Sequence, residues 1–212
     1  MMWWAVVCAG LVGLGWGAVL RTQLGRLTYR TADETSRQLP GPRWWLLPVT
    51  AASVTAIAGL AGRPGWGWIT VAPLALTGPW LAAVDFDVCR IPNRVLAPVA
   101  AGTLVALILV AGLQHDIAVV WVGMLGSLVA GGIFAAIHFL TRGGIGFGDV
   151  KLAAAIGLAL APNGLSTVWV ALLAGSIIGA LWALITAQKG SFAYGPWLLS
   201  GAWLAVIIAS ST

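Results

Sequence analysis

The sequence predicts an all-α, polytopic membrane protein, and both its composition and the arrangement of its apolar residues lead to this class. Of the 212 residues, 60% are hydrophobic and only 8% are charged, whereas a soluble domain carries about 25% charged residues. A single aqueous core cannot hide that much apolar surface. The net charge of +5 falls mainly between the apolar runs, so we interpret it as loop charge that orients the chain in a bilayer. We therefore expect a lipid bilayer and no nucleic acid as partner.

Eight apolar segments are candidates for transmembrane helices, and all but the sixth are near the length of about 20 residues that a bilayer requires. We treat residues 1–212 as one membrane domain. In chain order the segments cover residues 3–20, 44–61, 66–84, 95–113, 117–140, 149–161, 164–187 and 194–210. The first lacks the basic start of a signal peptide, so we expect it to remain as a span. The sixth is short, and we expect it to tilt or to pack among the other helices.

Two pairs of glycines predict how some of these segments pack. Gly13 with Gly17, and Gly175 with Gly179, have the GxxxG spacing. Small residues at this spacing allow two membrane helices to approach closely.

The basic residues predict the orientation of the spans. If eight spans alternate in direction, the loops on one face hold ten of the eleven basic residues: Arg21, Arg26, Arg30, Arg37, Arg43, Arg90, Arg94, Arg142, Lys151 and Lys189. The loops on the other face hold only Arg63. Because cytoplasmic loops are enriched in Lys and Arg, the first face is predicted to be cytoplasmic and both termini non-cytoplasmic.

Two aspartates at the predicted cytoplasmic face are candidates for catalysis. Asp85 closes the third span in "AAVDFDVCRIPNRV", and Asp149 opens the sixth in "GGIGFGDVK". An acid at membrane depth is a functional hypothesis by default. Helix capping would also explain Asp149 alone, and pairing with Arg90 or Arg94 would explain Asp85 alone.

The glycine run before Asp149 favours a functional reading of the acid. Glycine-rich backbone is costly to order and suits the close approach of an extended chain. Two aspartates that share one proton can act as general base and general acid on a water molecule. Such a dyad needs neither a metal nor another cofactor, and we expect none here.

Three motifs, in order, give the chain a resemblance to a known family. "GFGDVK" resembles the GxGD signature of membrane aspartyl proteases. Asp85 with the following "FDVCRIPN", and the late "FAYGPWLLSGAW", resemble the type IV prepilin peptidases over roughly residues 78–205. The tail "AYGP" departs mildly from the usual "PFGP".

The resemblance implies an activity, a location and a substrate class. It implies that Asp85 and Asp149 are the catalytic dyad of an aspartic endopeptidase in the cytoplasmic (inner or plasma) membrane of a prokaryote. The expected substrates are type IV prepilins or pseudopilins of protein secretion. The expected reaction removes their short basic leader at the cytoplasmic face.

Six residues near the dyad are candidates for substrate binding or support: Asp87, Pro92, Asn93, Gly146, Gly148 and Lys151. Asp87 is read either as support or substrate contact, or as a plain solvated acid. Lys151 is read as tuning the Asp149 carboxylate or, as we favour, as a cytoplasmic anchor. Pro92 disfavours helix in the residue before it, and Asn93 is expected to cap the next helix.

The loop 21–43, "RTQLGRLTYRTADETSRQLPGPR", is short, basic and without cysteine. Larger members of the family carry here an insert with paired CxxC motifs, associated with metal binding and with N-methylation of the cleaved pilin. We therefore expect neither a metal site nor N-methyltransferase activity. The acids of this loop, Asp33 and Glu34, are expected to be solvated.

Three other functions fit parts of the sequence. Proteases of the presenilin type share GxGD, but their "YD" and "PAL" motifs are missing here. A small proton-coupled transporter with intramembrane carboxylates is the main alternative, and it predicts acids near the bilayer midplane. A non-catalytic pilus assembly factor would tolerate the loss of one aspartate, yet both are present. Oligomeric state stays open.

Overall fold

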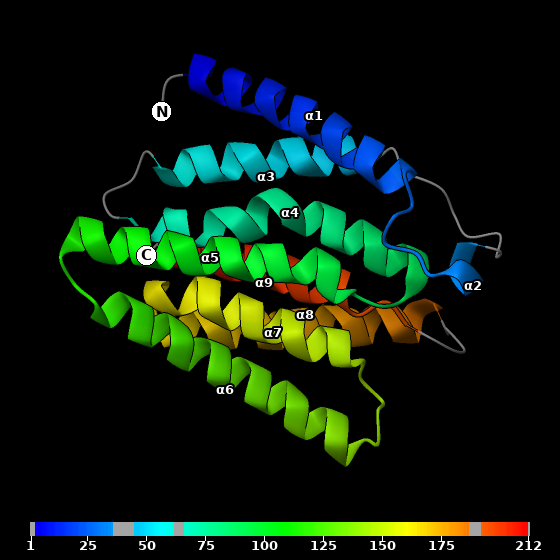
Figure 1. Ribbon diagram of the computed structural model, residues 1–212. Coiled ribbons are helices and arrows are strands. Elements are labelled where there is room, and N and C mark those ends of the chain that lie inside the picture. The colour runs from blue at the N-terminus through cyan, green and yellow to red at the C-terminus, as the bar shows by residue number, and fades with distance from the viewer. Residues whose placement is uncertain (1–2, 36–44, 62–65, 187–191, 212) are drawn as a thin grey trace.

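The computed structural model describes residues 3–35, 45–61, 66–186 and 192–211, and these ranges contain helices and turns but no strand. The elements, in order, are α1 (Trp3–Gly25), α2 (Ala32–Thr35), α3 (Leu46–Ala61), α4 (Gly67–Val88), α5 (Asn93–Gln114), α6 (Ala118–Leu140), α7 (Phe147–Leu160), η1 (Ala161–Asn163), α8 (Leu165–Thr186) and α9 (Gly195–Ser211). Figure 1 shows the eight longer helices side by side in one bundle, running alternately in opposite directions.

Each predicted span falls on one of these longer helices, and the all-α membrane class is confirmed. Among the described residues, five helices are long and apolar enough to cross a membrane: α1, α4, α5, α6 and α8. Helices α3 and α9 are apolar but shorter. Helix α7 has 14 residues, and it packs against α4, α5, α6, α8 and α9. The expectation that the short sixth segment packs among other helices is therefore confirmed.

Several predicted boundaries were wrong because charged residues do not end a helix whose opposite face is buried. Helix α1 continues to Gly25, since Leu20 and Leu24 pack into the bundle while Arg21 stays exposed on the same helix. Helix α4 likewise continues past residue 84 and carries Asp85 and Asp87 inside it. The one-turn helix α2 was not predicted.

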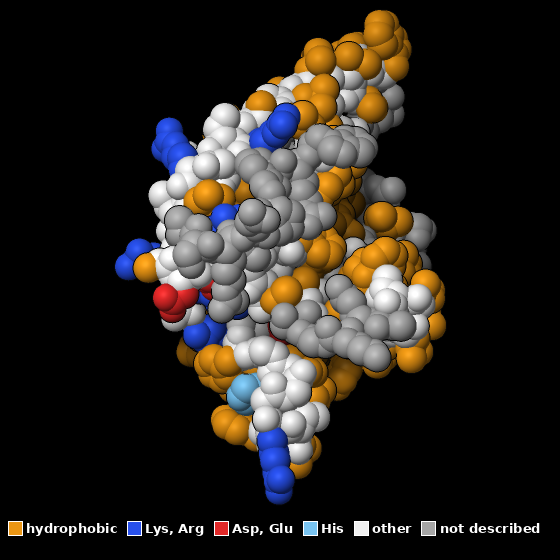
Figure 2. All heavy atoms as spheres, turned by 90° about the vertical axis from the view of Figure 1, so that its right-hand side faces the viewer, with side chains coloured by type: hydrophobic (Ala, Val, Ile, Leu, Met, Phe, Trp, Pro, Cys, Tyr) orange, Lys and Arg blue, Asp and Glu red, His pale blue; other side chains and the backbone are white. Residues whose placement is uncertain are grey.

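The alternating directions bring the charged segments to one end of the bundle. In Figure 1 the turns after α1, α4 and α6 lie at the right-hand end, whereas α1 begins and α9 ends toward the left. Figure 2 looks onto that right-hand end, where Lys, Arg, Asp, Glu and His side chains gather beside an apolar flank. Four basic residues of the orientation count, Arg37, Arg43, Arg63 and Lys189, lie outside the described residues. So do positions 36–43 of the loop and the first position of the predicted segment 44–61.

Both glycine pairs lie at close helix contacts, the first between α1 and α3 and the second between α8 and α9. A Cβ atom added to Gly13 would lie 2.5 Å from the Cα of Ala51, and one added to Gly175 would lie 2.8 Å from the Cα of Leu198. In each pair the second glycine faces the same neighbouring helix. Close contact of helix backbones at small residues is the usual way in which membrane helices associate.

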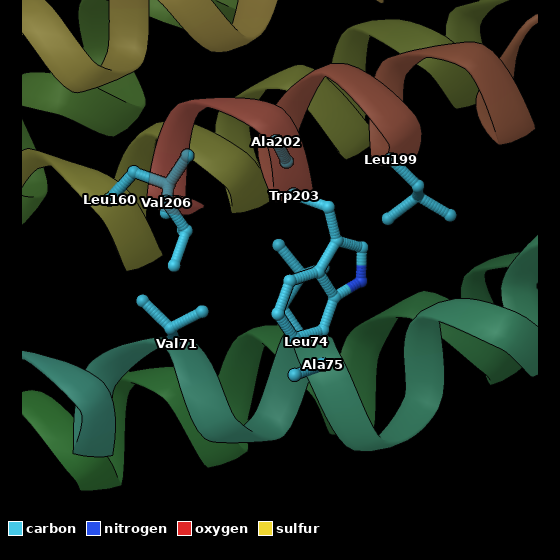
Figure 3. Close-up of a pocket in the computed structure, with 8 residues that line it drawn as sticks. All are labelled: Val71, Leu74, Ala75, Leu160, Leu199, Ala202, Trp203 and Val206. Atoms are coloured by element: carbon cyan, nitrogen blue, oxygen red, sulfur yellow. The ribbon is translucent and has the colours of Figure 1, made fainter. Parts of the chain in front are cut away.

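A small apolar cavity lies between α4, the end of α7 and α9 (Figure 3). Its volume is about 10 Å³, and its lining residues are Val71, Leu74, Ala75, Leu160, Leu199, Ala202, Trp203 and Val206. A space of that size holds about one water molecule. The lining includes neither Asp85 nor Asp149, so this cavity is a packing defect and not the candidate site.

Candidate active site

Asp85 lies in the last turn of α4, and its side chain is buried by the segment that leads into α9. The residue is 2% exposed, and its Oδ2 accepts a hydrogen bond of 2.8 Å from the backbone N–H of Gly195. Helix α4 ends because Cys89 adopts a left-handed conformation, with φ 50°, and donates its N–H to the Asp85 carbonyl. Among the described residues Asp85 forms an ion pair with neither Arg90 nor Arg94.

Asp149 lies in the first turn of α7, and it does not cap that helix. The N-cap is Gly146, in extended conformation, and no side chain caps the helix end. Asp149 is 7% exposed. Its Oδ2 would lie 3.2 Å from a Cβ atom at Gly146. The prediction of Asp149 as the N-cap residue is therefore wrong, and its carboxylate instead folds back over Gly146.

Asp85 and Asp149 come together although they stand far apart in the sequence. Their charges lie close enough to interact. Ile91 fills the space between the helices that carry them: its backbone N would lie 3.1 Å from a Cβ atom at Gly148. A Cβ atom at Gly195 would lie 3.0 Å from both the Ile91 Cδ1 and the Asp85 Oδ2. The glycines of "GFGD" and "AYGP" thus permit α4, α7 and the start of α9 to meet at the two acids.

Asp87, predicted as support or as a solvated acid, is buried and fully engaged. It accepts two hydrogen bonds of 2.8 Å from the Arg30 guanidinium and one from the Tyr29 hydroxyl. The solvated alternative is therefore wrong.

Lys151 and Asn93 contact each other and not the dyad. The Lys151 Nζ donates to the Asn93 Oδ1 at 2.7 Å and lies 4.9 Å from the centre of the Phe147 ring. The N-cap of α5 is Pro92, in extended conformation. The expectation that Asn93 caps α5 was wrong, because Asn93 is already the first helical residue and its side chain binds Lys151.

Glu34, expected to be solvated, forms an ion pair with Arg90. Both guanidinium–carboxylate hydrogen bonds measure 2.6 Å, and Arg90 holds the pKa of Glu34 down at about 2. Asp33, its neighbour, is exposed as expected. Sequence reasoning missed the roles of Tyr29, Arg30, Glu34, Arg90 and Gly195, and no local motif marks the first four.

No group of three or more His, Cys, Asp or Glu side chains within the described ranges is arranged to hold a metal ion. The two cysteines, Cys8 and Cys89, are unbridged and exposed. The arrangement at the dyad is that of two buried carboxylates near enough for their charges to interact. Such a pair can exchange protons with a bound water molecule.

Comparisons with known proteins show the family of the chain. The type IV leader peptidase family matches residues 71–184, a stretch that includes both Asp85 and Asp149. The prepilin leader peptidase/N-methyltransferase of Aeromonas salmonicida (strain A449) is 30% identical over 178 residues, covering 80% of this chain and 59% of that protein. The Neisseria gonorrhoeae protein of the same name is 32% identical over 155 residues, covering 68% and 51%. The chain thus spans a little over half the length of these relatives.

No solved structure matches the chain. The family assignment therefore depends on sequence, and the family match extends over more than half of the 212 residues. The protein belongs to the type IV leader peptidase family.

Proposed function

We propose that this protein is a membrane-embedded aspartic endopeptidase that removes the leader from type IV prepilins or pilin-like precursors. The observation that carries the proposal is the meeting of two buried aspartates, Asp85 and Asp149, at the charged end of an apolar helix bundle. Membership of the leader peptidase family supplies the substrate class. The curated relatives are named as prepilin leader peptidases.

The proposed mechanism uses one proton shared between the two carboxyl groups. Two like charges in a buried site resist simultaneous ionisation, so one group is a carboxylate and the other a carboxylic acid. The carboxylate removes a proton from water as the water oxygen attacks the scissile carbonyl. The carboxylic acid supplies a proton that the amine receives as the C–N bond breaks. Hydrolysis of one peptide bond consumes one water molecule and leaves the dyad with one proton again.

The position of the dyad favours proteolysis over transport. Asp85 lies in the last turn of α4 and Asp149 in the first turn of α7. Both therefore lie near one end of the bundle, whereas transporter sites lie near the midplane. We propose that this end faces the cytoplasm, because it collects the described basic residues of the orientation count, as cytoplasmic faces do. A leader on that side and an apolar helix in the bilayer would place the scissile bond at the two acids.

The test is cleavage of a co-expressed type IV prepilin by wild type, Asp85→Asn and Asp149→Asn. We expect each variant to lose more than about 1,000-fold in cleavage rate, since removal of either member of a catalytic unit costs nearly the whole effect. Asp116→Asn is the matched control. Asp116 is an exposed acid at the other end of the bundle, where it accepts a hydrogen bond from the Ala118 N–H.

Membrane insertion is measured for each variant, so that a loss of cleavage is not a loss of protein. Cleavage at the wild-type rate by either dyad variant would show that the assignment of that aspartate is wrong. If the wild type cuts no prepilin, the substrate class is wrong. The asparagine variants then serve to test whether proton-coupled transport depends on the same acids.

A further inference from the structure

The segment 26–35, which follows α1, is fastened to the end of α4 by a buried ion pair. The Arg30 Nε and Nη2 atoms each donate a hydrogen bond of 2.8 Å to Asp87, one to each carboxylate oxygen. The Arg30 and Asp87 side chains are 5% and 4% exposed. The Tyr29 hydroxyl donates to the same carboxylate. Asp87 therefore receives three hydrogen bonds from two consecutive residues of the segment.

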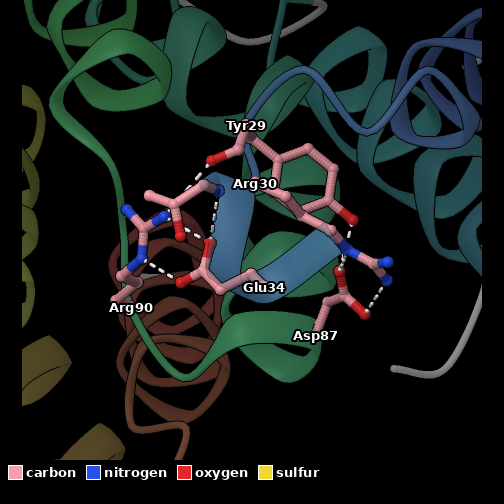
Figure 4. A network of polar contacts seen from close by, with 6 residues as sticks. Tyr29, Arg30, Glu34, Asp87 and Arg90 are labelled. Atoms are coloured by element: carbon pink, nitrogen blue, oxygen red, sulfur yellow. Dashed lines mark hydrogen bonds and ion pairs between the residues drawn. The ribbon is translucent and has the colours of Figure 1, made fainter. Parts of the chain in front are cut away.

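A second ion pair joins the same two parts of the chain with the charges reversed. Here the segment supplies the acid, Glu34, and the turn after α4 supplies the cation, Arg90. The Glu34 carboxylate also accepts a hydrogen bond of 2.7 Å from the Thr31 N–H. Arg90 in addition donates to the Tyr29 carbonyl at 3.4 Å. Figure 4 shows the two pairs side by side, with segment 26–35 lying across the end of α4.

We call these four charged residues, Arg30, Asp87, Glu34 and Arg90, the crossed clamp. Bidentate pairing of a guanidinium with a carboxylate fixes orientation as well as distance. Two such pairs of opposite sense resist sliding of one segment along the other, because each displacement breaks one pair or brings like charges together. The crossed clamp therefore determines where the end of α4 lies.

The two clamp residues on the α4 side, Asp87 and Arg90, lie next to residues that shape the candidate site. Asp87 lies two residues after Asp85 in the same helical turn. Arg90 lies between Cys89, whose left-handed conformation ends α4, and Ile91, which separates Gly148 from Gly195. A shift of this turn would move both Asp85 and the residue that sets the spacing of α4, α7 and α9.

Burial of Arg30 and Asp87 carries a desolvation cost, so a buried pair is weak evidence for stability. Such a pair does fix the distance and the orientation between the two segments that carry it. The three hydrogen bonds also leave both oxygens of Asp87 engaged with protein donors. These observations give Asp87 a role in placing its neighbours and none in proton transfer.

We propose that segment 26–35 is a positioning element of the active site, and that the crossed clamp holds the turn 85–91 so that Asp85 faces Asp149. This inference rests on the proposed peptidase function. It gives the short loop a role of its own: it braces the first catalytic aspartate from the cytoplasmic side.

The more exposed pair of the clamp allows a charge-exchange test. Glu34→Arg and Arg90→Glu each place two like charges opposite one another. Displacement of a reacting group by about 1 Å costs roughly 100-fold in rate, so we expect each single variant to lower the kcat of prepilin cleavage by about 10- to 100-fold with KM unchanged. The double variant restores the pair with its signs exchanged and should recover most of the loss. Arg21→Glu, an equal charge change on the exposed face of α1, should leave kcat unaltered.

The buried pair is tested with the conservative variant Arg30→Lys, which keeps the charge but loses the bidentate geometry. We expect the same fall in kcat at unchanged KM. A double variant that cleaves no better than the singles would overturn the proposal. So would single variants that cleave at the wild-type rate, or variants that change KM alone, which would indicate a substrate contact.

A second readout does not depend on cleavage. The Gly195 N–H donates a hydrogen bond of 2.8 Å to the Asp85 Oδ2, so hydrogen–deuterium exchange of this amide reports whether Asp85 keeps its place. Exchange is measured in detergent on proteins with no substitution at the site itself. We expect Glu34→Arg or Arg90→Glu to speed exchange at Gly195 and the two together to restore slow exchange.

The two readouts separate this inference from the proposed function. If the wild type cleaves no prepilin, hydrogen exchange at Gly195 alone decides whether the clamp holds Asp85 in place. Exchange that is equally slow in wild type and single variants would show that the crossed clamp positions nothing. Slow exchange that is lost in the single variants and restored in the double variant, without any cleavage by the wild type, would retain the clamp and refute the peptidase.

Discussion

Asp85 and Asp87 lie two residues apart on one helix, yet their carboxylates have different hydrogen-bond partners. Asp87 is bound by a guanidinium and a phenol, whereas Asp85 accepts a single backbone N–H bond. Both oxygens of Asp87 are thus occupied by side-chain donors, whereas Asp85 lies near a second acid, Asp149. The roles that we propose for these two acids therefore follow from the hydrogen-bond partners of their carboxylate oxygens and not from their closeness in the sequence.

Asparagine at these two positions should separate structure from catalysis. Asp87→Asn deprives the buried Arg30 of its carboxylate, and breaking such a pair costs about 3–5 kcal/mol of unfolding free energy. Asp85→Asn removes a buried charge that has no cationic partner among the described residues and keeps an acceptor for the Gly195 N–H. We expect it to alter unfolding free energy by less than about 1 kcal/mol. Denaturant unfolding of the purified proteins in detergent measures both. Equal destabilisation would contradict this division of roles.

The pH dependence of stability should reveal the Glu34–Arg90 pair. Arg90 lowers the pKa of Glu34 from 4.5 to about 2. A pKa that is lower in the folded state contributes stability above the ordinary value, and that contribution is lost as pH falls from about 4.5 toward 2. The difference in melting temperature between wild type and Glu34→Gln should therefore shrink as pH is lowered through this range. A difference that stays constant down to pH 3 would argue against the pair.

At the scale of the helices, glycines decide which elements touch. Gly13 faces α3, and Gly175 faces α9, each against backbone atoms of its neighbour. The same device operates at the site, where Gly148 lies against the Ile91 backbone and Gly195 against Asp85. A Cβ atom would press on the Ile91 backbone at Gly148 and on the Asp85 and Ile91 side chains at Gly195. Glycine at both positions therefore favours the close approach of α4, α7 and α9.

A matched pair of glycines in α1 tests this packing. A Cβ atom at Gly13 would lie 2.5 Å from the Ala51 Cα, whereas one at Gly15 would meet nothing within 4 Å. Gly13→Ala should lower unfolding free energy by about 1–3 kcal/mol through overpacking. Gly15→Ala should raise it by up to about 1 kcal/mol, because alanine favours helix. Thermal unfolding in one detergent compares the two. If Gly13→Ala were as stable as Gly15→Ala, α1 would not pack on α3 through this face.

Across the whole molecule, the alternating directions of the helices bring the residues of the candidate site to one end of the bundle. The end of α4 and the beginnings of α7 and α9 meet there, together with segment 26–35. No single stretch of chain contains the site: its parts come from residues 29–34, 85–91, 146–149 and 194–195. The apolar majority of the chain thus serves to hold a few polar groups at one face of the bundle.

Much of this arrangement was predictable from sequence because its causes are local. Apolar runs of suitable length predicted the longer helices, and the GxxxG pairs marked two faces at which helices approach closely. The motifs around Asp85 and Asp149 selected both candidate acids, since "DFDVCRIPN" and "GFGDVK" are short and distinctive. An even number of predicted spans lies between the end of the third, at Asp85, and the start of the sixth, at Asp149. Because spans alternate in direction, both acids were predicted at the same face. Their catalytic role remains a prediction that the asparagine variants will test.

By itself the sequence determined the class of the protein, its family and the two candidate acids, since hydropathy, helix length and motif spacing are written along the chain. Only the tertiary structure decided the partners of the other charged residues. Glu34 was expected in solvent but pairs with Arg90, and Asp87 joins Arg30 across 57 positions of the chain. The local sequence around a charged residue is the same whether its side chain faces water or an opposite charge. The difference depends on which distant segment folds against it, and no local pattern encodes that.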